Sequence, residues 1–106
     1  MRIEFVKTRS GFLKPCLEAI SHRPPREPGE ILQIAFASSG GYRGRMRVVV
    51  TPDSLVDFET DWVGSVVTRF PARIKAAATA LRDAHCFGNF EIAHTEGKLT
   101  ITRLPD

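Results

Sequence analysis

An apolar stripe between residues 70 and 81 constrains the fold of this chain more than any other feature. Its members recur every three or four residues: Phe70, Ile74, Ala77, Ala78 and Leu81. This spacing places them on one face of a helix, and the intervening alanines add helix propensity. Thr68 is a suitable N-cap, Pro71 fits a first turn and Gly88 can end the helix. The pattern therefore predicts a main helix of about eighteen residues.

The residues that follow predict a β-hairpin around a two-residue turn at Glu96-Gly97. That turn pairs Thr95 with Lys98 and places His94 opposite Leu99. Four apolar residues then share one face of the hairpin: Phe90, Ile92, Leu99 and Ile101. A shift by one residue would scatter this set, so the register is self-consistent. We expect the helix to cover this face, with His94 on it as a partly buried side chain.

Weaker patterns precede the main helix. Ile3 and Phe5 alternate with polar residues, which predicts a half-buried strand, and residues 13–20 predict a short helix. Alternating segments at 30–37 and 45–51 predict a second hairpin, closed by the glycine-rich segment between them. Thr51-Pro52 resembles a helix start, so a helical turn or two is expected from there to Phe58.

These elements together predict an α+β fold. An antiparallel sheet of four or five strands packs against one main helix in the C-terminal half and closes with a β-hairpin. The length of 106 residues fits a single globular domain over residues 1–106. With 42% hydrophobic and 25% charged residues the composition excludes disorder, and no apolar run is long enough to cross a membrane. We expect a cytoplasmic protein with no membrane association.

Charge is distributed unevenly along the chain, although its formal total is only +3. Residues 1–50 carry nine basic and four acidic side chains, and residues 51–68 carry four acidic and no basic ones. Residues 69–106 carry six basic and four acidic side chains. This basic–acidic–basic order indicates two candidate surfaces.

The first candidate is a nucleic-acid-binding surface. Arginines interleaved with glycine and one aromatic ring can hold phosphate oxygens while the ring stacks on a base. The expected centre of contact is Tyr42, Arg43, Arg45 and Arg47, with Arg69 and Arg73 at its edge. We therefore predict a small non-catalytic module or accessory subunit that binds DNA or RNA, with an affinity that falls steeply as salt rises.

The alternative is a protein-interaction or self-assembling domain. Its docking surface would be the acidic segment 53–61, represented by Asp57, Glu59 and Asp61, together with Trp62. The partner would be another protein or a second copy of the chain.

Catalytic patterns are weak throughout. Pro52-Asp53 followed by Glu96-Gly97-Lys98 matches the letters of a metal-dependent nuclease, but the second group coincides with a hairpin turn. His85 and Cys86 are adjacent, and neighbouring residues on a helix point in different directions. Cys16 and Cys86 have no metal-ligand spacing and are expected as buried free thiols. We expect no catalytic residues, metal or cofactor, and favour a binding protein over an enzyme.

Overall fold

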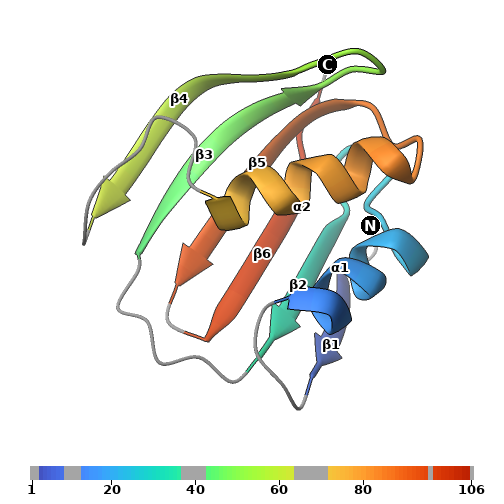
Figure 1. The fold of residues 1–106 in the computed structure, drawn as a ribbon, viewed down its shortest axis with the longest axis vertical. Coiled ribbons are helices and arrows are strands. Elements are labelled where there is room, and N and C mark those ends of the chain that lie inside the picture. The colour runs from blue at the N-terminus through green and yellow to red at the C-terminus, as the bar shows by residue number, and fades with distance from the viewer. Residues whose placement is uncertain (1–2, 9–12, 37–42, 64–71, 96, 106) are drawn as a thin grey trace.

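The computed structural model describes residues 3–8, 13–36, 43–63, 72–95 and 97–105; for 13, 43 and 57–63 it describes the backbone. These residues form six strands and two helices (Figure 1). In chain order they are β1 (Ile3–Lys7), α1 (Leu13–His22), β2 (Ile31–Ala35), β3 (Arg43–Val50), β4 (Leu55–Val63), α2 (Ala72–Asp83), β5 (Gly88–Thr95) and β6 (Lys98–Arg103).

The strands form one sheet in the order β1-β2-β6-β5-β3-β4, and both helices lie on the same face of it (Figure 1). Neighbouring strands are antiparallel except β1 and β2, which are parallel and joined through α1. The α+β class is therefore confirmed. The expected sheet of four or five antiparallel strands lacks one strand, β4, because helical turns were expected there, and its pairing is not wholly antiparallel, because β1 and β2 are parallel. The short helix predicted at residues 13–20 is α1.

The C-terminal hairpin has the predicted register. Thr95 pairs with Lys98, His94 with Leu99, and Ile92 with Ile101. The apolar residues of this face are fully buried under the helices. The prediction succeeded because a tight turn fixes the register and only one register gathers the apolar residues on one side.

The predicted hairpin between residues 30–37 and 45–51 is wrong. β2 and β3 are not neighbours, since β6 and β5 lie between them. β2 pairs with β6 and β3 pairs with β5, both antiparallel. The C-terminal hairpin thus inserts into the centre of the sheet, between β2 and β3.

The predicted helical turns from Thr51 to Phe58 are also wrong, because Leu55–Val63 is strand β4. Residues Thr51 to Ser54 instead form a turn: the Thr51 N–H donates to the Ser54 carbonyl, and the Ser54 N–H donates to Thr51 Oγ1, 3.0 Å in each case. The apparent helix cap is therefore a side-chain-stabilised turn. Pairing along β3 outweighs any local helical preference.

The main helix is confirmed in position, and its described part runs for 12 residues from Ala72 to Asp83. The expected cap and first turn at Thr68, Phe70 and Pro71 lie outside the described residues. The helix also ends before Gly88. His85 has φ 55°, the Cys86 N–H donates to the Leu81 carbonyl, and the His85 N–H donates to the Arg82 carbonyl. This is a Schellman ending with histidine in the position usually taken by glycine.

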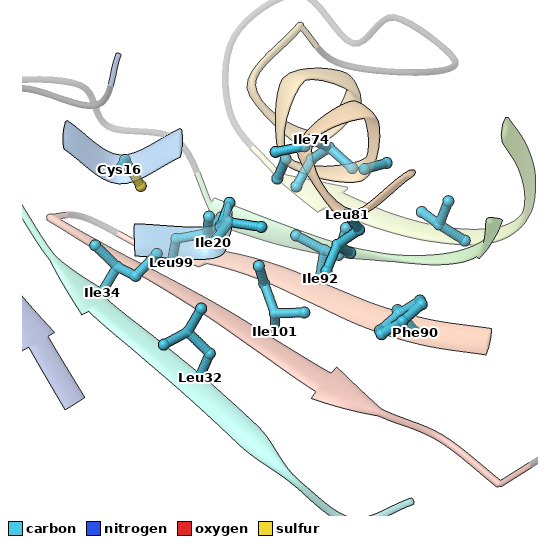
Figure 2. Packing of buried hydrophobic residues seen from close by; sticks show 14 of the residues in the cluster. Cys16, Ile20, Leu32, Ile34, Ile74, Leu81, Phe90, Ile92, Leu99 and Ile101 are labelled. Carbon is cyan, nitrogen blue, oxygen red and sulfur yellow. The ribbon is translucent and has the colours of Figure 1, made fainter. Parts of the chain in front are cut away.

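A single apolar core lies between the helices and the sheet (Figure 2). Ile74 and Leu81 of α2 and Cys16 and Ile20 of α1 point toward the strands, and all four are completely buried. Each large apolar side chain buried in this way contributes roughly 1.5–3 kcal/mol relative to exposure. No helix among the described residues has the length and apolar character needed to cross a membrane.

Candidate functional site

Arg45 and Arg47 are exposed on the sheet face opposite the helices, which we call the open face. They alternate along β3 with Met46 and Val48, whose side chains are buried in the core. The predicted placement of these two arginines away from the core is therefore correct. Alternation of side chains along a strand is sufficient to produce it.

The strand register surrounds these arginines with acidic positions. Arg45 lies opposite Asp61 of β4, and Arg47 lies opposite Glu59. On its other side Arg47 lies opposite Glu91 of β5. Both arginines have interaction partners within the structure. The five positions carry two positive and three negative formal charges.

Arg73 lies on the other side of the sheet, in the helix layer. Its Nη1 is 3.1 Å from Nε2 of His94, and its guanidinium carbon lies 5.9 Å from the centre of the Phe36 ring. The guanidinium can only donate, so Nε2 accepts and His94 is the neutral tautomer with its proton on Nδ1. His94 lies on the apolar face as predicted, but it is completely buried rather than partly buried. Arg73 therefore anchors α2 to the sheet rather than extending the Arg45–Arg47 surface.

The remaining predicted nucleic-acid contacts are only partly described. The Arg43 backbone begins β3 opposite Val63. Tyr42 and Arg69 lie outside the described residues. The structure thus brings Arg45 and Arg47 together on one face and separates Arg73 from them by the thickness of the sheet.

Residues 55–61 of the acidic segment lie in β4, an edge strand of the sheet, and Asp53 lies in the turn before it. Within the described chain β4 pairs with β3 alone. The register shifts between Arg47 and Val48, so that Asp57 lies opposite Val48 while Glu59 lies opposite Arg47. Trp62 lies opposite Gly44, in line with His94 one strand further on. Edge strands offer unpaired backbone groups to another chain.

The two cysteines are free and buried, as predicted. Burial raises the pKa of Cys16 from 9.0 to about 12, an effect that the positive charge of Arg73 opposes only in part. Burial also raises the pKa of Cys86, whose thiol lies 3.5 Å from the Pro25 carbonyl oxygen. Both thiols are therefore protonated at neutral pH, whereas a cysteine nucleophile must be a thiolate. The adjacent His85 is exposed.

Two residues of the nuclease-like pattern, Asp53 and Lys98, lie far apart. The end of β3 at Val50 pairs with Gly88, whereas its start at Gly44 pairs with His94. Asp53 follows the first of these ends and Lys98 lies near the second, about 20 Å along the strands at 3.3 Å per residue. Glu96 lies outside the described residues. Across the described chain no group of three or more His, Cys, Asp or Glu side chains is placed to hold a metal ion.

One feature that sequence reasoning missed is the exposure of β1. Ile3 and Phe5 are 62% and 56% exposed, although their alternation predicted a half-buried strand. It is Val6 that packs against the core. The sequence shows that odd- and even-numbered residues of this strand face opposite sides of the sheet. Which set faces the helices depends on the pairing of β1 with β2, and no local pattern predicts that pairing.

A groove of about 440 Å³ runs between α1 and α2 on the outer surface of the helix layer. Its lining includes the small residues Ala72, Ala76 and Ala80 of α2 and Leu17 of α1. It contains no cluster of converging charged groups, because Lys75 and Asp83 lie two turns apart on α2. Comparison of the chain with protein-family models, curated proteins and solved structures finds no match.

Proposed function

We propose that this chain is a protein-interaction domain that binds an extended, basic segment of a partner protein along the outer edge of β4. One observation carries the proposal: the acidic segment of the sequence forms an edge strand of nine residues. A partner strand added there gains backbone hydrogen bonds along its length and charge complementarity from its side chains.

The acidic residues of β4 favour a basic partner. Acidic residues stand at positions 57, 59 and 61 of β4. Antiparallel pairing of this segment with itself would bring acidic residues of the two copies opposite one another, which is destabilising. A partner with lysine or arginine at alternate positions meets Glu59 and Asp61 favourably, since these two positions share one face of β4, whereas the register shift places Asp57 on the other face. The proposal therefore names a basic partner protein in preference to a second copy at this edge.

Nucleic-acid binding through Arg43, Arg45 and Arg47 stays a prediction with less support. Its affinity would come mainly from phosphate contacts and counterion release. Three acidic positions flank Arg45 and Arg47 in register, which weakens the positive potential that such contacts need.

The test uses an eight-residue peptide that alternates lysine with threonine, and a matched peptide that alternates glutamate with threonine. The lysine peptide is expected to bind and to slow hydrogen exchange of β4 backbone amides; the glutamate peptide is not. Neutralising β4 by Asp57→Asn, Glu59→Gln and Asp61→Asn should weaken binding about fivefold, since the pairs made by Glu59 and Asp61 each contribute roughly 0.5 kcal/mol.

A matched control removes the same number of charges elsewhere. Glu18, Glu27 and Asp83 are exposed acidic residues outside β4, and their neutral analogues should leave peptide binding unchanged. Equal weakening by both triple variants would show a general charge effect and overturn the proposal. Duplex DNA or RNA binding that is lost on replacing Arg43, Arg45 and Arg47 by glutamine would establish the other function instead.

A further inference from the structure

We propose that a second copy of this chain pairs with β1 across a two-fold axis at Phe5, joining two sheets into one continuous twelve-stranded sheet. This surface lies at the edge opposite β4 and does not depend on the function proposed for β4 (Figure 1).

The first step is the exposure of apolar side chains on an edge strand. Ile3 and Phe5 are the most exposed large apolar side chains among the described residues, and Ile31 of β2 lies opposite Ile3. Within the described chain β1 pairs with β2 alone, so its outer edge is open to a further strand. Monomeric proteins usually protect such an edge with charge, proline or a bulge. β1 carries one charged residue on this face, Lys7.

The second step is the self-complementarity of β1. A two-fold axis perpendicular to the sheet at Phe5 pairs all five strand residues with those of the second copy. Phe5 then meets Phe5 on the open face, Ile3 meets Lys7, and Glu4 meets Val6 on the helix side. No like charges are opposed, and aromatic pairs across strands are favourable.

Neighbouring registers are worse. An axis at Glu4 opposes two carboxylates, and an axis at Val6 pairs only three residues of the strand. Glu4 is also already neutralised on the helix side, because Nη1 of Arg23 lies 3.3 Å from its Oε2. One register therefore combines the longest pairing, the aromatic contact and the absence of charge repulsion. Its two-fold symmetry closes the assembly at two copies, whereas head-to-tail pairing of β1 with β4 would extend without limit.

The first test is the mass of the protein in solution over a range of concentrations, by sedimentation or light scattering. The wild-type chain is expected to shift from monomer to dimer as concentration rises, and Phe5→Lys should raise the dissociation constant at least tenfold. Val56→Lys is the matched control, since Val56 is 47% exposed at the other edge of the sheet. A wild-type chain that stays monomeric, or equal effects of the two variants, would overturn the proposal.

The second test reads the register directly by disulfide trapping. Both native thiols are buried, so a cysteine placed on β1 is the reactive thiol under mild oxidation. Phe5→Cys should cross-link to itself. Ile3→Cys and Lys7→Cys should each cross-link poorly alone and efficiently when mixed, because position 3 faces position 7 of the second copy. Cross-linking of Ile3→Cys to itself as fast as the mixture reacts would rule out this register.

Because the β4 edges lie at the two ends of the joined sheet, the dimer would present two acidic edges. Failure of the β1 tests removes the dimer and leaves peptide binding at β4 unaffected. Failure of the peptide test removes the β4 function and leaves the solution mass unaffected.

Discussion

At the residue scale, the fold depends on the close packing of Gly88 against Arg103. Gly88, at the start of β5, has φ 133°, a conformation that side chains of L-residues rarely adopt. A Cβ atom there would lie 2.5 Å from Nη2 of Arg103. Arg103 is itself nearly buried, with its guanidinium 5.0 Å from the centre of the Phe90 ring. Glycine is therefore required both by the backbone and by the close approach of a packed arginine.

Gly88→Ala is expected to destabilise the protein by about 2–3 kcal/mol, because it adds backbone strain and displaces Arg103 from its ring. Urea denaturation measures the change. Gly97→Ala is the comparison, since Gly97 has φ 73° and its added Cβ would lie 3.3 Å from the Phe36 carbonyl oxygen. That variant should cost about 1 kcal/mol. A smaller loss for Gly88→Ala than for Gly97→Ala would contradict the contact assigned to Arg103.

At the scale of elements, the charges of β3 are matched to those of its two neighbours. Arg47 lies between Glu91 of β5 and the Glu59 position of β4, and Arg45 lies between Ala93 and the Asp61 position. The sequence separates these groups into basic and acidic segments. The register places them side by side, so the arginines of β3 stand opposite acidic positions of β4 and β5.

Arg47→Glu should reduce stability by about 1 kcal/mol, because like charges then stand directly opposite across two strand pairs. Adding Glu91→Arg should restore about half of this loss by recreating one opposite pair. The same Glu91→Arg change should not rescue Arg45→Glu, since Arg45 faces Ala93 on β5. A double-mutant cycle by urea denaturation gives the coupling energies, and equal rescue of both arginine variants would contradict the register.

At the scale of the whole molecule, both helices cover the same face of one sheet, and the apolar core lies between them. The interior excludes water from two thiols and from His94, and within the described chain each edge strand, β1 and β4, pairs with one neighbour. The interior therefore disfavours the ionised form of the buried thiols.

Stability should fall above pH 9 because of the buried thiols. Burial raises the pKa of Cys16 from 9.0 to about 12, so the unfolded chain ionises at this residue before the folded one does. Stability from this group is complete below pH 9 and is lost as pH rises toward 12, by up to about 1.4 kcal/mol per pH unit. Urea midpoints measured from pH 8 to about 10.5 should fall less steeply for Cys16→Ala than for the wild type. Parallel curves would contradict the assignment.

The sequence determined the features that depend on neighbouring residues. The apolar stripe of α2 follows from the helical period of 3.6 residues. The β5–β6 register follows from the two-residue period of a strand and from one tight turn, and all of these patterns span only a few residues. Two local signals were misleading. Thr51-Pro52 starts a turn closed by the Thr51 side chain instead of a helix, and the main helix ends at His85, ahead of Gly88, in a Schellman motif.

Only the tertiary structure decided the strand order and, with it, the character of the surface. Inserting β5 and β6 between β2 and β3 pairs residues far apart in the chain, and this choice depends on burying one common core rather than on any local pattern. That order sets Glu91 beside Arg47, turns Arg73 inward to His94 and leaves Ile3 and Phe5 on an edge strand. Which charges stand opposite one another, and which strands lie at an edge, depends on which strands are neighbours. The packing of the whole chain around one core determines those neighbours.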